Sequence, residues 1–200
     1  CIAPDYFFVH RSIKKEFIAA VIAEIQRSAF SLENGNYVQI VNEQNVNRLV
    51  QMIDPSKVIF GGKYDVTKRL IEPTIIDNVS FDDAIMQEEI FGPLLPIIEY
   101  EDISQAINYV KQGEKPLSCY VFTSNSAIKN RFLKEISFGG GGVNEAIMHI
   151  TTSNLPFGGV GASGMGSYHG EAGFKAFSHF KSIMDKPTWM ELNLKYSPRT

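Results

Sequence analysis

Cysteine is scarce in this chain of 200 residues, in which Cys1 and Cys119 are the only two. Two cysteines cannot form the disulfide framework of a small secreted domain, so the sequence favours a reducing, cytoplasmic location. Hydrophobic runs are short: none reaches the roughly 18 residues of a membrane span, and no charged-then-apolar leader opens the chain. We therefore expect neither a membrane partner nor export.

Basic residues are too few and too dispersed for a nucleic-acid surface. Lys and Arg number 19 against 22 Asp and Glu, which gives a formal net charge of −3. The four histidines form no pair at metal-ligand spacing, so no metal site is predicted. His149 lies in a glycine-flanked segment and could line a pocket, although a structural role is the simpler interpretation.

The composition is that of an ordinary globular domain, with 44% hydrophobic, 12% aromatic and 20% charged residues. A chain of this length can bury about 70% of its unfolded surface, which is enough for a core. Its first residue is Cys1 rather than Met. Either processing exposes this cysteine or the chain is the C-terminal piece of a longer protein, and composition leaves both open.

Hydrophobic periodicity predicts an α/β fold. The predicted helices cover 12–29 (with Ser12 as N-cap), 42–53, 103–110 and 128–136, and the predicted strands cover 6–9, 58–60, 73–76, 94–100, 117–122 and 177–184. The predicted strands do not alternate cleanly between apolar and polar residues, and helices separate them. We therefore expect a mostly parallel sheet flanked by helices. Pro96 indicates that the strand 94–100 starts there or lies at a sheet edge.

Two short segments carry side chains suited to catalysis. A thiol such as that of Cys1 is a good nucleophile once ionised and can hold an acyl group as a thioester. In 88–93, of sequence Glu-Glu-Ile-Phe-Gly-Pro, a carboxylate could accept hydrogen bonds from a ribose diol while the Phe ring packs on a flat heteroaromatic group. Successive side chains of an extended segment point to opposite faces, so one of the two carboxylates, Glu88 or Glu89, is expected to point inward. Taken alone, each segment has a simpler interpretation: a chain start without chemical meaning, and an ordinary acidic turn.

A glycine-rich stretch contains Gly159, Gly161 and Gly164 at the spacing of a dinucleotide-binding fingerprint. That fingerprint needs a strand before it and a helix opening after it. Here Pro156 precedes it, and further glycines weaken any following helix. We therefore predict a loop whose backbone approaches a substrate or another domain, not a phosphate-binding loop.

Together these motifs resemble the aldehyde dehydrogenase superfamily. The resemblance rests on Cys1-Ile2-Ala3-Pro4-Asp5-Tyr6, on Met86-Gln87-Glu88-Glu89-Ile90-Phe91-Gly92-Pro93, and on Asn154-Leu155-Pro156-Phe157-Gly158-Gly159-Val160-Gly161 followed by Ser163-Gly164-Met165-Gly166. The Ala-Pro-Asp-Tyr after the cysteine, His149-Ile150-Thr151 and 166–170 are similar to the class 3 branch. The likeness runs through essentially the whole chain in the family's order.

The resemblance implies a chemistry and roles for particular residues. It places Cys1 at the catalytic nucleophile, which attacks an aldehyde to give a thiohemiacetal. Hydride transfer to NAD or NADP then leaves a thioester, which water hydrolyses to the carboxylic acid. It places Glu89 at the nicotinamide ribose and Phe91 beside the nicotinamide ring, so both are expected to bind the cofactor.

The resemblance also implies a substrate pocket and a domain organisation. Ile150, Thr151 and Phe157 match a hydrophobic substrate funnel, which suits aliphatic or aromatic aldehydes and limits water. Residues 1–176 correspond to a catalytic domain, and 177–200 to an oligomerisation strand and tail, so the full-length protein is expected to be a homodimer.

Family members carry about as many residues again before the cysteine. That part holds the dinucleotide-binding domain, the general-base glutamate and the oxyanion-hole asparagine, so we predict that the isolated chain neither binds NAD(P)+ tightly nor oxidises aldehydes. Two alternatives stay open: an N-terminal-nucleophile hydrolase, in which the α-amine of Cys1 is the base, and a non-catalytic assembly module. The residues present decide neither the aldehyde's chain length nor the choice between NAD and NADP.

Overall fold

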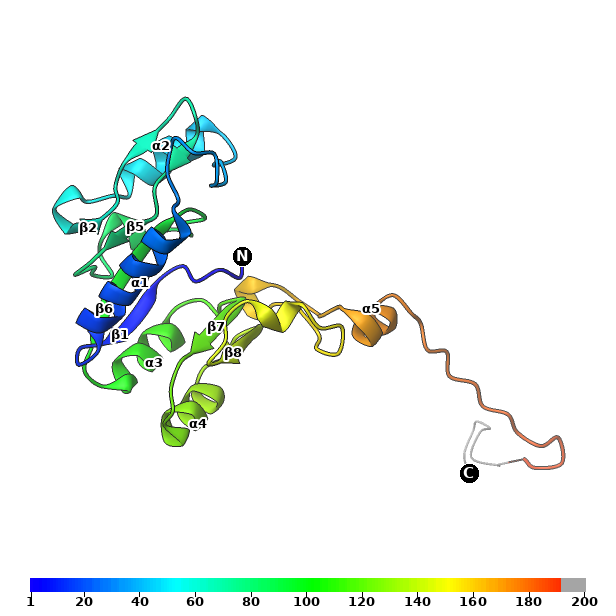
Figure 1. The fold of residues 1–200 in the computed structure, drawn as a ribbon. Helices are drawn as coiled ribbons and strands as arrows, with labels where there is room; N and C mark the ends of the chain where they lie inside the picture. Colours follow the sequence, from blue (N-terminus) through cyan, green and yellow to red (C-terminus); the bar gives the residue numbers. More distant parts are fainter. Residues whose placement is uncertain (192–200) are drawn as a thin grey trace.

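The structure, a computed structural model, describes residues 1–191 and is built around a four-stranded sheet (Figure 1). The strand order is β1 (Phe7–His10), β6 (Leu94–Tyr100), β5 (Thr74–Ile76) and β2 (Val58–Phe60). Both β1 and β5 pair parallel to β6, and β2 pairs antiparallel to β5. The predicted α/β class with a mostly parallel sheet is confirmed.

Helices cover both faces of this sheet. α1 (Lys14–Ser28) packs on the face that carries Ile97, and α2 (Glu43–Gln51) packs on the face that carries Ile98. Successive residues of a strand point to opposite faces, and here both faces are buried. This two-sided burial is why β6 lacks the alternation of a half-exposed strand. α2 begins where it was predicted, because the Asn42 side chain accepts the backbone N–H of Asn45 at 2.8 Å.

A second, smaller region follows in the chain. Its parallel strands β7 (Ser118–Val121) and β8 (Gly140–Val143) pack with α3 (Ile103–Gln112) and α4 (Ser126–Glu135). α3 contacts both β6 and α4, so it joins the two regions. The remaining elements are β3 (Tyr64–Asp65), β4 (Leu70–Ile71), α5 (Gly170–Ala176) and the 3-10 turns η1 (Pro55–Lys57), η2 (Ala84–Met86), η3 (Met148–Ile150) and η4 (Gly161–Ser163). None of the helices in residues 1–191 combines the length and apolar character that a membrane span requires.

Two local predictions are wrong. Ser12 is not the N-cap of α1, which begins at Lys14 after Ile13, because the Ser12 hydroxyl lies 2.7 Å from Nδ1 of His10 instead. Pro96 does not make β6 an edge strand. The pairing of β6 with β1 starts at Ile97, so Pro96 lies in the half of the strand that pairs only with β5, where a missing N–H is tolerated.

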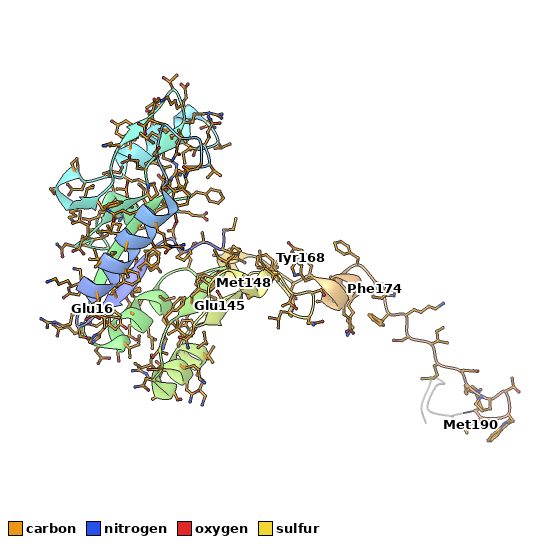
Figure 2. All side chains as sticks on the ribbon, in the orientation of Figure 1. Glu16, Glu145, Met148, Tyr168, Phe174 and Met190 are labelled. Carbon is orange, nitrogen blue, oxygen red and sulfur yellow. The ribbon has the colours of Figure 1, made fainter. Side chains whose placement is uncertain are left out.

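The predicted strand 177–184 is also not formed in the described part of the chain. A strand needs a partner to complete its hydrogen-bond ladder, and this segment runs away from both regions (Figure 1). Its apolar side chains are left in solvent, with Phe177 93% and Met184 92% exposed. Figure 2 shows Phe174 on α5, before this segment, and Met190 after it, and both are exposed. The last part of the predicted tail, 192–200, lies outside the described residues.

Candidate active site

The segment that precedes β1 carries Cys1 to the junction between the two regions (Figure 1). It is tied to both of them: the Tyr120 hydroxyl of β7 donates to the carbonyl of Ile2 at 2.7 Å, and Oδ1 of Asp5 accepts the backbone N–H of Ile90 at 2.9 Å. Cys1 itself is exposed. Its thiol is therefore accessible to a small-molecule substrate while the backbone behind it is anchored.

The structure brings Cys1 and Glu89 together from distant parts of the sequence. Asp5 accepts the N–H of Ile90 and so joins the two segments, and the terminal ammonium nitrogen on Cys1 lies 3.7 Å from Oε1 of Glu89. Glu88 and Glu89 are both exposed, with 56% and 60% of their side chains in solvent, so the expectation that one carboxylate points inward is wrong. The residue that points inward is Ile90, which is 1% exposed in the core beneath α2.

Phe91 follows on the same turn and is 65% exposed. Its φ of 52° lies in the left-handed region, which a bulky residue adopts only where its surroundings enforce it. The turn thus presents a carboxylate and an aromatic ring side by side in sequence, both facing solvent. An exposed carboxylate can accept hydrogen bonds from a ribose diol, and an exposed ring can pack on a nicotinamide, so the residues present fit NAD or NADP.

The predicted substrate residues lie beside the second region. Ile150 closes η3, and Thr151 follows it with its hydroxyl donating to the carbonyl of Met148 at 2.8 Å. Phe157 pairs with Tyr168 through backbone hydrogen bonds of 2.7 and 2.9 Å.

Aromatic contacts connect Phe157 to the Cys1 segment. The Phe157 ring lies 6.1 Å from the His149 ring, and the His149 ring lies 5.7 Å from that of Tyr120, the residue that holds Ile2. Both ring nitrogens of His149 are buried without a hydrogen-bond partner in the described residues, and burial lowers the pKa of this imidazole. The backbone of Ile2, the residue after Cys1, is thus linked to Phe157 through the rings of Tyr120 and His149.

Sequence reasoning missed Asp5 and Tyr120 as parts of this site. It also missed Arg48 of α2, whose guanidinium donates to the backbone carbonyl groups of the turn that carries Glu89. Tyr120 lies in a strand that was predicted as one continuous apolar run, which conceals its hydroxyl. Burial raises the pKa of the Asp5 carboxyl, and the hydrogen bond from Ile90 opposes that rise. No sequence motif marks Arg48.

The second cysteine has different surroundings from Cys1. Cys119 is partly buried within β7, and burial raises the pKa of its thiol to about 11. A thiol with such a pKa carries almost no thiolate at neutral pH and is a poor nucleophile. The exposed Cys1 is therefore the better candidate for covalent chemistry.

The glycine-rich stretch is a loop, as predicted. Gly161–Ser163 forms the short turn η4, in which the Ser163 hydroxyl accepts the N–H of Val160 at 2.9 Å. The next α-helix begins only at Gly170. The strand and helix that a dinucleotide fingerprint requires do not flank the loop. Residues 1–191 also hold no group of three His, Cys, Asp or Glu side chains that could bind a metal ion.

Comparisons with known proteins show which family the chain is similar to. Residues 1–183 match the aldehyde dehydrogenase family. The 4,4'-diaponeurosporen-aldehyde dehydrogenase of Staphylococcus aureus is 43% identical over 203 residues, covering 99% of this chain and 44% of that protein. Aldehyde dehydrogenase family 3 member A2 of Mus musculus is 39% identical over 206 residues, covering 100% of this chain and 42% of that protein.

A solved structure shows the same fold. The substrate-bound state of Staphylococcus aureus AldH matches with a TM-score of 0.92 and 42% identity, covering 98% of this chain and 44% of that chain. The chain thus spans less than half the length of these relatives. With the fold, the order of the motifs and the family match in agreement, the chain belongs to the aldehyde dehydrogenase family and is class 3-like within it.

Proposed function

We propose that the intact protein oxidises aldehydes to carboxylic acids with Cys1 as its nucleophile. The observation that carries this proposal is the hydrogen bond from the backbone N–H of Ile90 to Asp5, which holds the segment of Cys1 beside the turn of Glu89 in a chain of this family. The Cys1 thiolate bonds to the carbonyl carbon of the aldehyde to give a thiohemiacetal, and once the C–H bond of that carbon breaks, with its hydride passing to the nicotinamide, the sulfur holds the acyl group as a thioester. Water cleaves the thioester, which releases the acid and regenerates the thiol.

NAD+ or NADP+ supplies the hydride acceptor when it is bound. The chain's own residues orient the reaction: Glu89 accepts hydrogen bonds from the ribose, and the Phe91 ring packs beside the nicotinamide. Ile150, Thr151 and Phe157 form the wall that receives the aldehyde, and their apolar surfaces limit water near the thioester.

A homodimer of the intact protein accounts for the exposed apolar side chains of the extended segment. Phe177, Phe180, Ile183 and Met184 are each at least 73% exposed, a patch that a folded protein ordinarily covers. A second copy of the protein is the occupant we propose, with 177–184 adding to a sheet of the partner as the oligomerisation strand. We place the protein in the cytoplasm because both of its described cysteines are free thiols.

The two alternative functions have less support. An N-terminal-nucleophile hydrolase would have a sandwich of antiparallel sheets, whereas β1, β6 and β5 pair in parallel, as do β7 and β8. An assembly module would have no use for an exposed cysteine beside an exposed carboxylate. That residues 1–200 alone do not turn over aldehydes stays a prediction.

The assay is formation of reduced nicotinamide by the intact protein with hexanal or benzaldehyde and either dinucleotide. We expect Glu89→Ala to raise the KM for the dinucleotide about tenfold, since it removes charge-assisted hydrogen bonds, and to leave the KM for the aldehyde near that of the wild type. Glu88→Ala is the matched control, because Glu88 is equally exposed and adjacent. Failure to reduce either dinucleotide would refute the proposed function, and equal effects at Glu88 and Glu89 would refute the role of Glu89.

A further inference from the structure

The turn 88–92 presents Glu89 and Phe91 to solvent but has no helix or strand of its own. Both side chains are more than half exposed, so few packing contacts hold them. Their direction is therefore set by the backbone of the turn. The groups that hold this backbone decide how well the two side chains can meet a ligand.

Arg48 of α2 holds two consecutive carbonyl groups of the turn. Its Nη1 donates to the carbonyl of Glu89 at 3.1 Å, and its Nη2 donates to the carbonyl of Ile90 at 2.7 Å. A guanidinium can do this because its donors lie in one rigid plane, whereas a lysine ammonium is a single point. Nη1 also lies 3.6 Å from Oε2 of Glu88.

The helix that carries Arg48 is firmly anchored. Leu49, the next residue, is fully buried and packs against Gly92, where a Cβ atom would lie 2.6 Å from Cδ1 of Leu49. Two neighbouring residues of α2 thus contact both halves of the turn. A mobile surface arginine could not fix the turn in this way.

Asp5 holds the turn from the opposite direction by accepting the N–H of Ile90 at 2.9 Å. Asp5 lies only four positions after Cys1. The backbone of the turn is therefore clamped between α2 and the segment that carries the nucleophile. The amide and the carbonyl of Ile90 are held by two different charged side chains.

We propose that Arg48 is a positioning residue for the dinucleotide, acting through the backbone of Glu89 and Ile90 on the directions of Glu89 and Phe91. This inference rests on the proposed function, which assigns those two side chains to the cofactor. It adds a residue outside the motifs on which the family resemblance rests. It also explains how Phe91 is kept in an unfavourable backbone conformation.

The test is Arg48→Met in the intact protein, which keeps the length of the side chain and removes its donors. We expect the KM for NAD+ or NADP+ to rise about tenfold or more, with the KM for the aldehyde and the rate of Cys1 alkylation unchanged. Arg48→Lys is expected to give an intermediate rise, because an ammonium reaches one carbonyl well but not both. Arg131→Met is the matched control, since Arg131 bonds Glu135 and Ser104 in α4 and α3, away from the turn.

Unchanged KM values for the dinucleotide in both Arg48 variants would overturn the proposal. The proposal would also be overturned if Arg48→Met lowered thermal stability and raised the KM for both the dinucleotide and the aldehyde, and Arg131→Met did the same. That result would show that Arg48 has only a general structural role. If the wild type oxidises no aldehyde, the proposed function fails. The positioning role of Arg48 can still be tested by measuring the binding of NAD+ or NADP+ by calorimetry. In that case weaker binding of NAD+ or NADP+ to Arg48→Met than to the wild type supports it, and equal binding or none to either protein overturns it.

Discussion

Replacing Cys1 by serine in the intact protein is expected to lower the rate of aldehyde oxidation by about a thousandfold or more, as loss of a catalytic nucleophile does. A serine hydroxyl is almost wholly protonated at neutral pH and is a far weaker nucleophile than a thiolate. The measurement is kcat/KM from initial rates of dinucleotide reduction. Because Cys1 is exposed, the substitution should leave the melting temperature nearly unchanged.

The second cysteine supplies the matched control. Cys119 is partly buried in β7 with its pKa raised to about 11, so Cys119→Ser should keep most of the activity and lose some stability. A Cys1→Ser protein with the wild-type rate would contradict the assignment of the nucleophile. Loss of activity in Cys119→Ser but not in Cys1→Ser would identify Cys119, and not Cys1, as the nucleophile.

Gly141→Ala is expected to destabilise the protein by about 3 kcal/mol or more, the upper range for overpacking of a rigid site. A Cβ atom at this position would lie 1.8 Å from the carbonyl oxygen of Cys119, the residue it pairs with on β7. That oxygen belongs to the backbone of a parallel strand, so it cannot move aside without breaking the pair. Urea denaturation of the variant and the wild type measures the loss.

Activity should fall together with stability in this variant. β7 carries Tyr120, which holds Ile2 beside the nucleophile, and β8 leads into the segment that contains Ile150. Gly113→Ala is the control, because its added Cβ would approach no atom closer than 3.8 Å, and this change should alter stability by less than about 1 kcal/mol. Equal stability of the two variants would contradict the close approach of β7 and β8.

Much of the fold could be predicted because it depends on local patterns and on burial from two sides. Adjacent buried residues such as Ile97 and Ile98 predict a strand covered on both faces, and the structure confirms it. The predicted strand 177–184 could not be confirmed, because pairing depends on a partner that sequence periodicity does not reveal. Ser12 was wrong as a cap for a similar reason: its hydroxyl lies at hydrogen-bond distance from His10 instead.

The site was less accessible to reasoning from residues alone. Cys1 and Glu89 each had a simpler interpretation by themselves, and the family resemblance was needed to connect them. The structure adds the 2.9 Å hydrogen bond from the N–H of Ile90 to Oδ1 of Asp5, which brings their two segments together. No sequence motif could identify Arg48. Its partners are backbone carbonyl groups 41 and 42 positions away, and a residue of any type supplies such a carbonyl.

The most direct test of the account is to trap the acyl group on the nucleophile. The intact protein is incubated with an aldehyde and NAD+ or NADP+, quenched in acid before the thioester is hydrolysed, digested and mapped by mass spectrometry. The account predicts one acyl adduct, on the peptide that contains Cys1, which disappears when the dinucleotide is omitted. An adduct on Cys119 or on any other side chain, or turnover with no adduct on Cys1 at any quench time, would contradict it.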